Sequence, residues 1–235
     1  MTAKERNICM IAHRGYSGKY HENTELAFIK AGEHASGGAE TDIRVTADGV
    51  YVCSHNETAV LENGEELYVS RSTFAELTAQ PLKSKFEGQK VYLCTFRRYL
   101  EIMKQFDMVC FVELKGAFTP AQVKGVFGLV EEVYELKKCI LQSFDKENLL
   151  EARRQFPDLP LMLTYGFNCG DYRFCLDEGI SIDCDYNAVT PAIISDFRSK
   201  NLEVAVWTVN DAEDFEKVKL MDVDYIESDF FGGND

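Results

Sequence analysis

The chain lacks several features that would place it in other classes of protein. No stretch approaches the ~18 consecutive apolar residues that a membrane-spanning helix needs. Residues 1–6 run directly into an apolar segment, without the apolar core and cleavage site of a signal peptide. No internal repeat and no Gly/Ser-rich linker is visible. We therefore expect a single domain, residues 1–235, in the cytoplasm and without a membrane anchor.

Positive charge is also scarce, because 25 Lys and Arg stand against 39 Asp and Glu, giving a net charge of -14. This balance argues against a nucleic-acid partner and against an anionic membrane surface. The eight cysteines include no C-x-x-C pair, so zinc and dithiol redox sites are not expected. Most lie in apolar segments and are expected to pack as small hydrophobic side chains in a reducing compartment.

What the chain does contain is an alternation of short apolar, β-branched segments with segments of helical periodicity. Eight such strands closing a (β/α)8 TIM barrel, an α/β fold, are the prediction, and a doubly wound open sheet is the alternative. The expected strands are residues 7–13, 39–45, 108–115, 139–144, 160–165, 181–185, 203–209 and 225–229. The expected helices are residues 25–34, 95–106, 119–136, 146–155, 170–178, 191–200 and 211–220.

One segment breaks this alternation after the second strand. Residues 51–54 read as an extra strand, and residues 55–91 are polar and lack the repeating pattern. We expect this segment to form a small cap insertion over the mouth of the barrel.

Side chains capable of acid–base chemistry or ion binding lie at or near the ends of the expected strands. His13 and His55 can exchange protons near neutral pH, and Arg14 suits a phosphate-like anion. Glu40 and Asp42 are two residues apart on a strand, so they share one face and can hold a hard cation. Barrel enzymes build their sites at this end of the strands. The pattern indicates metal-assisted acid–base chemistry on a phosphate ester.

The third expected strand adds Glu113 and Lys115, again on one face. With Glu40 and Asp42 this gives three carboxylates on adjacent strands. Ligands that are all oxygen suit Mg²⁺ or Ca²⁺ and not zinc. Lys115 offers a point charge for a phosphoryl oxygen.

At this level of detail the chain resembles the glycerophosphodiester phosphodiesterases, a family of metal-dependent (β/α)8-barrel enzymes that release glycerol 3-phosphate and an alcohol. The resemblance covers nearly the whole chain and depends on the order and spacing of short motifs. These are His13-Arg14-Gly15, Glu22-Asn23-Thr24, Glu40-Thr41-Asp42, Asp48-Gly49, His55, Arg71-Ser72-Thr73, Glu113-Leu114-Lys115, Gln142-Ser143-Phe144-Asp145, Trp207-Thr208-Val209-Asn210 and Ser228-Asp229.

The resemblance implies a role for each candidate residue. His13 and His55 are expected to be the base and the acid, and Arg14 and Lys115 phosphate contacts. A single Mg²⁺ or Ca²⁺ is the implied cofactor, with ligands Glu40, Asp42 and Glu113. Trp207, the only tryptophan, is either core packing or a wall of the glycerol pocket, and we assign it to substrate binding. Water-soluble glycerophosphodiesters and a role in phospholipid head-group salvage are the implied substrates and pathway.

Three positions depart from the family pattern: His21 where proline is usual, Asn56 where aspartate is usual, and Ser228 in place of threonine. Loss of the charge at position 56 is expected either to lower the pKa of His55 or to remove a minor contact that orients a ligand. Glu22 suits either a cap on the first helix or a role in the site. His21 and His34 lack a motif context and are expected to be exposed.

Rival functions remain open at this point. One is a lipid-directed phosphodiesterase on the same barrel, such as a lysophospholipase D or a phosphatidylinositol-type lyase, although the acidic chain shows no basic interfacial surface. Another is a metal-dependent lyase or racemase with Lys115 as base, which leaves both histidines unexplained. A third is a non-catalytic phosphodiester-binding barrel. The sequence does not fix the oligomeric state.

Overall fold

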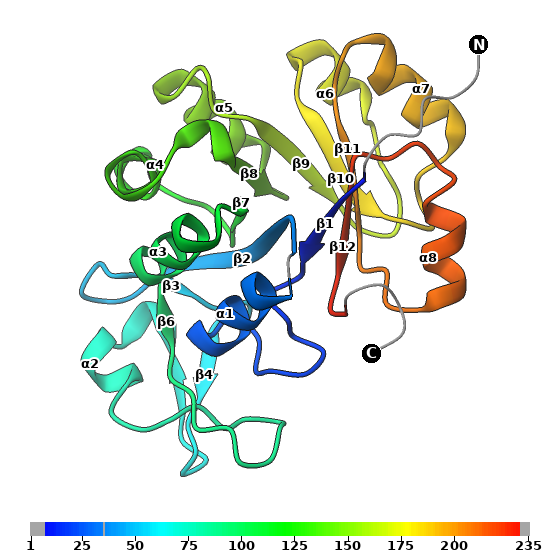
Figure 1. The fold of residues 1–235 in the computed structure, drawn as a ribbon. Helices are drawn as coiled ribbons and strands as arrows, with labels where there is room; N and C mark the ends of the chain where they lie inside the picture. Colours follow the sequence, from blue (N-terminus) through cyan, green and yellow to red (C-terminus); the bar gives the residue numbers. More distant parts are fainter. Residues whose placement is uncertain (1–7, 35, 231–235) are drawn as a thin grey trace.

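Eight parallel strands close into a barrel in the computed structural model, which describes residues 8–34 and 36–230 (Figure 1). Around the barrel the order is β1-β2-β7-β8-β9-β10-β11-β12, and β1 pairs with both β2 and β12. The strands are β1 Cys9–Ala12, β2 Gly38–Val45, β7 Val109–Leu114, β8 Cys139–Ser143, β9 Leu161–Tyr165, β10 Ser181–Asp185, β11 Val204–Trp207 and β12 Tyr225–Ser228. Closure confirms the TIM-barrel prediction and excludes the open sheet.

The inward faces of these strands are built in two layers. An apolar cluster consists of Ile11, Phe111, Ile140, Met162 and Ala205, and it is separate from the larger cluster that includes the helices. Because side chains alternate along a strand, the residue two positions later faces the same way. That second layer is polar, and it reads His13, Glu113, Gln142, Thr164 and Trp207. The apolar layer therefore closes the barrel below a polar end that remains available for chemistry.

Seven helices surround the barrel, and the larger hydrophobic cluster fills the space between them and the strands. Most begin at a residue whose side-chain oxygen accepts a backbone hydrogen bond, such as Thr24, Thr119 and Asp145. They are α1 Glu25–Glu33, α3 Phe96–Phe106, α4 Pro120–Val133, α5 Lys146–Gln155, α6 Arg173–Glu178, α7 Pro191–Ser199 and α8 Ala212–Val218, all within the described residues.

The expected boundaries hold to within three residues, and the differences lie at the ends of elements. The helix expected from residue 170 begins at Arg173, because Gly170 has a positive φ of 49° and the chain turns there. The helix expected to reach residue 136 ends at Val133 and is followed by a separate 3-10 turn, η2 Leu136–Lys138. The strand expected over residues 203–209 ends at Trp207. Residue 7 of the first expected strand lies outside the described residues.

The segment after β2 folds against the side of the barrel mouth. The extra strand is present as β3 Tyr51–Cys53, antiparallel to β2, and β3 in turn pairs with β6 Cys94–Thr95. Between them lie β4 Thr58–Val60, β5 Glu66–Tyr68, η1 Val69–Arg71 and α2 Phe74–Leu77. These elements lie at the lower left of Figure 1 and share a small hydrophobic cluster of their own. We refer to residues 55–91 as the cap segment.

All eight cysteines are free, and seven of them are buried. Seven lie in strands or helices and Cys169 in the loop before α6. Among the described helices, none combines the length and the apolar character required to cross a lipid bilayer.

Candidate active site

A cavity of 90 Å³ opens at the carboxyl ends of the barrel strands. Seven of the eight predicted site residues line it, and the eighth, Asp42, is buried behind the others with 1% of its surface exposed. The seven are His13, Arg14, Glu40, His55, Glu113, Lys115 and Trp207. Residues that are up to 194 positions apart in the chain, 13 and 207, thus meet at one place.

His13 follows β1 and is held by a carboxylate from the end of β12. Its Nδ1 lies 2.8 Å from Asp229 Oδ1, and the same oxygen accepts a hydrogen bond from Ser17 Oγ at 2.7 Å. The second oxygen of Asp229 accepts a hydrogen bond from Asn210 Nδ2. Burial acts to raise the pKa of Asp229, but the hydrogen bond and charge of His13 outweigh it and hold that pKa well below its usual value. Nδ1 of His13 therefore carries the proton and Nε2 faces the cavity as an acceptor.

Three carboxylates from β2 and β7 form the acidic part of the site. Asp42 and Glu113 are register partners across the two strands, and oxygens of Glu40, Asp42 and Glu113 lie within 4.8 Å of one another. Burial raises the pKa of Glu40 well above its ordinary value, and burial with the charge of Asp42 raises the pKa of Glu113 to about 7. Buried carboxylates at this separation repel one another. Their donor set fits a hard divalent cation that would neutralise them.

Two basic side chains reach the same carboxylates. Lys115 Nζ lies 2.9 Å from Glu113 Oε1 and 3.3 Å from Asp42 Oδ1. Arg14 Nε lies 3.3 Å from Asp42 Oδ2 without donating a hydrogen bond to it. Burial acts to raise the pKa of Asp42, but Arg14 and Lys115 outweigh it and lower that pKa. Arg14 and Lys115 thus favour the charged form of Asp42, whereas burial favours the protonated forms of Glu40 and Glu113.

Arg14 is fixed by its own neighbours. Its backbone N–H donates to Glu40 Oε2 at 2.8 Å, and its Nη1 donates to Glu22 Oε1 at 3.2 Å. Its φ of 56° is unusual for a residue with a side chain and is of the kind found at functional sites. Of the two interpretations of Glu22, the role in the site is supported, because the cap on α1 is Thr24.

His55 follows β3 and reaches the cavity from the start of the cap segment. Arg44 holds its backbone carbonyl with two hydrogen bonds of 3.1 and 2.7 Å, and its Nδ1 lies 3.1 Å from Asn56 Oδ1. Burial lowers the pKa of His55. The pKa is lowered, as one of the two expectations had it. Its main cause is burial and not the missing charge at position 56.

Trp207 forms part of the cavity wall, and its predicted role in substrate binding stays a prediction. It meets Phe144 edge to face with ring centroids 6.4 Å apart, and Lys115 Nζ lies 5.8 Å from the centroid of the Phe144 ring. An aromatic wall beside a cluster of charges offers an apolar surface to the carbon skeleton of a small substrate.

The family is shown by a match along nearly the whole chain. Residues 13–232 match the model of the glycerophosphoryl diester phosphodiesterase family. The chain belongs to this family.

Individual members of the glycerophosphoryl diester phosphodiesterase family resemble the chain along most of its length. A glycerophosphodiester phosphodiesterase of Caldanaerobacter subterraneus subsp. tengcongensis is 27% identical, over 94% of this chain and 93% of its own. The crystal structure of a putative family member from Silicibacter pomeroyi superposes with a TM-score of 0.86 at 24% identity, covering 97% of this chain and 91% of that one. A phosphodiesterase of Oleispira antarctica, solved in complex with the product sn-glycerol-3-phosphate, gives 0.85 at 20% identity and covers 94% and 92%.

Family membership confirms two predictions made from the sequence, the glycerophosphodiester phosphodiesterase resemblance and the enzyme class, a phosphoric diester hydrolase. One prediction was wrong. His21 is half-buried and not exposed. Its backbone N–H donates a hydrogen bond to Gln89 of the cap segment, and burial lowers the pKa of its side chain.

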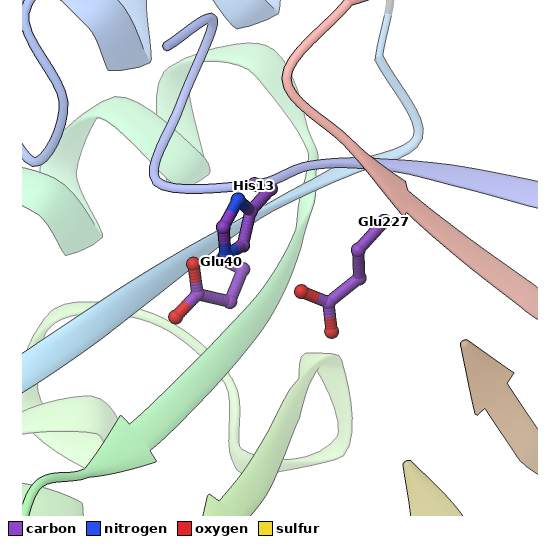
Figure 2. A group of neighbouring side chains, drawn as sticks. All are labelled: His13, Glu40 and Glu227. Carbon is purple, nitrogen blue, oxygen red and sulfur yellow. The ribbon is translucent and has the colours of Figure 1, made fainter. Parts of the chain in front are cut away.

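Sequence reasoning also missed part of the barrel interior of this phosphodiesterase. Glu227 and Asp183 are each 2% exposed and line the same cavity. Figure 2 shows Glu227 converging with His13 and Glu40, and these three also present possible ligand atoms within 4.8 Å of one another. Glu227 accepts a hydrogen bond from Gln142 at 2.7 Å, and among the described residues neither acid has a basic ion-pair partner. The sequence signal was an acid directly after an isoleucine in each of two short strands, Asp183 in β10 and Glu227 in β12.

Proposed function

We propose that the chain hydrolyses water-soluble glycerophosphodiesters to glycerol 3-phosphate and an alcohol, with Mg²⁺ or Ca²⁺ as cofactor. The observation that carries this proposal is the convergence of the His13–Asp229 pair, His55 and the carboxylate group in one cavity. The product bound to the Oleispira antarctica relative supports the glycerol 3-phosphate half of the reaction.

The cation would be held by Glu40, Asp42 and Glu113, whose oxygens are close enough for shared coordination. A divalent cation in such a site supplies charge neutralisation for a phosphoryl group. Arg14 and Lys115 stand beside these carboxylates and would orient phosphate oxygens. Trp207 would pack against the carbon atoms of glycerol.

Two proton transfers accompany the exchange of phosphorus–oxygen bonds. His13 takes the proton of the attacking hydroxyl at Nε2, whether that hydroxyl belongs to the glycerol of the substrate or to water. As the new phosphorus–oxygen bond forms, the bond to the leaving alcohol breaks and His55 gives its proton to the departing oxygen. If the glycerol hydroxyl attacks, water then opens the cyclic phosphate with the two roles reversed. Asp229 stabilises the His13 imidazolium that forms.

The test measures release of glycerol 3-phosphate from glycerophosphocholine and glycerophosphoinositol, with Mg²⁺, with Ca²⁺ and with a chelator. The wild type should release product only with a cation, and His13→Ala should lower kcat/KM by about 10²-fold to 10⁴-fold. His34→Ala, at an exposed histidine that does not line the cavity, is the control and should keep full activity.

Other outcomes assign other functions. Release from lysophospholipids and not from soluble diesters would favour the lipid-directed alternative. Binding without turnover by a folded protein would favour the non-catalytic barrel. Soluble substrates would fit a role in head-group salvage in the cytoplasm.

A further inference from the structure

A second, larger cavity lies between the cap segment and the barrel. Its volume is 280 Å³, against 90 Å³ for the cavity at the barrel mouth. β4 and the cap residues Lys83 and Lys85 line it, together with His21 and Glu22 from the loop after β1. His55 lines both cavities, so the proposed acid stands at the boundary between them.

The two cavities suit different halves of a diester. The smaller one holds the carboxylates, the phosphate contacts and the aromatic wall of Trp207, which fits a glycerol phosphate common to all such substrates. The larger one begins where His55 would protonate the departing oxygen. The variable alcohol therefore has room on the side of the cap segment.

The lining of the larger cavity is cationic. Lys83 and Lys85 are exposed, and no salt bridge within the described part of the chain involves either. The carboxylate on the lining, Glu22, is engaged with Arg14. The neutral polar groups include Ser54, Asn56 and Thr58.

No phenylalanine, tyrosine or tryptophan is among the residues described as lining this cavity. Quaternary ammonium groups are recognised by the faces of aromatic rings and by negative charge. Two lysines repel such a group, and the nearby ring of Phe86, which is not on the lining, already has Lys85 Nζ 5.1 Å from its centroid. Lysine, asparagine and hydroxyl side chains instead donate hydrogen bonds to hydroxyl oxygens.

We propose that this cavity binds the leaving alcohol and prefers an uncharged, hydroxyl-bearing head group, such as inositol or glycerol, over choline. This inference rests on the proposed function. Lys83 and Lys85 set the preference through charge, so they determine specificity without taking part in bond breaking.

The experiment compares kcat/KM for glycerophosphoinositol and for glycerophosphocholine, because the ratio cancels every effect on the phosphate that both share. The wild type should favour the inositol ester. The double variant Lys83→Glu, Lys85→Glu should shift the ratio toward choline by about tenfold. Lys90→Glu, on the same segment but outside this cavity, is the control and should leave the ratio within about twofold of the wild type.

The outcomes separate this inference from the proposed function. Release of glycerol 3-phosphate from both esters with an unchanged ratio in the double variant, or a wild-type preference for choline, would overturn the inference alone. Absence of release from both esters would overturn the proposed function and the inference with it. The single variants show which lysine contributes more, and thermal unfolding of each variant verifies that the fold is intact.

Discussion

Asp229 is surrounded by hydrogen-bond donors. His13, Ser17 and Asn210 all donate to its two oxygens, so both oxygens must be acceptors. Asp229→Asn would place an NH₂ group against one of these donors. The proton of His13 would then no longer be held on Nδ1. We expect kcat to fall by about 10²-fold to 10⁴-fold, with a much smaller change in KM. Steady-state kinetics together with thermal unfolding make the measurement, and a loss confined to stability would contradict the positioning role.

The assignment of His55 as the acid makes its own prediction at the residue scale. A leaving group that departs as a stable anion needs no proton, so the acid becomes dispensable for it. His55→Ala should therefore lose about 10²-fold or more on glycerophosphocholine but much less on glycerol phosphate esterified to p-nitrophenol.

The reverse pattern would exchange the two roles. If His13→Ala and not His55→Ala were spared by the p-nitrophenyl ester, His13 would be the acid and His55 the base. Equal losses of both variants on both esters would argue against separate acid and base roles.

Residue-scale contacts were the hardest to foresee from the sequence. His13 and Asp229 are 216 positions apart, and they meet because β1 pairs with β12 when the barrel closes. The motifs placed both residues at strand ends but carried no information on their pairing. The prediction for His21 was wrong for a similar reason, since His21 contacts the cap segment, where Gln89, 68 positions away, accepts a hydrogen bond from its backbone N–H.

At the scale of elements, the barrel closes at a narrow seam. β1 and β2 share two register pairs, Ile11 with Gly38 and Ala12 with Ala39. Gly38 has no room for a side chain, because a Cβ there would lie 2.6 Å from the backbone oxygen of Val109 and 2.7 Å from Ile11 Cδ1. The strands can approach this closely because the residue is glycine.

Gly38→Ala should therefore loosen the seam. We expect a loss of about 1–3 kcal/mol in the free energy of unfolding from overpacking. For a chain of this size that corresponds to a decrease of roughly 2–10 °C in Tm, measurable by calorimetry.

Gly128 in α4 is the matched control, because a Cβ there would meet nothing within 4 Å. Gly128→Ala should raise stability by up to about 1 kcal/mol through helix propensity. Equal Tm values for the two variants would show that the seam is not tightly packed.

Elements themselves were largely predictable. Continuous apolar runs such as residues 109–112 mark strands buried on both faces, and threonine or aspartate caps mark helix starts. The irregular ends were not predictable to the residue, because local turns such as the one at Gly170 decide them. The internal structure of the cap segment was not predicted either, since its short strands β4 and β5 are stabilised by one small shared cluster.

On the scale of the whole molecule, buried acids link stability to pH. Burial raises the pKa of Asp183 and of Glu227 well above their ordinary values. The folded state then keeps a proton that the unfolded chain releases above about pH 4, so stability falls as pH rises from there toward the raised pKa. Tm measured with a chelator present should accordingly be lower at pH 8 than at pH 5.

Asp183→Asn removes one of these titrations, and its Oδ1 has no hydrogen-bond partner to lose. The decrease in Tm between pH 5 and pH 8 should become smaller by about 2–4 °C, equivalent to roughly 1 kcal/mol. Asp177→Asn, at an exposed position, is the control and should leave the decrease unchanged. Asp145 is unsuitable because it caps α5. Parallel curves for wild type and Asp183→Asn would contradict the linkage.

The free cysteines give the molecule a set of built-in reporters of its own opening. They are spread around the structure on β1, β3, β6, β7, β8, β10, α6 and the loop before α6. Burial raises the pKa of Cys110 to about 12, so its reactive thiolate is nearly absent while the barrel stays closed. The rate at which each cysteine is alkylated, followed by mass spectrometry, would therefore report how readily the region around it opens to solvent. An order of labelling in which Cys53 and Cys94 precede Cys110 and Cys139 would mean that the wall beneath the cap segment opens before the centre of the barrel does.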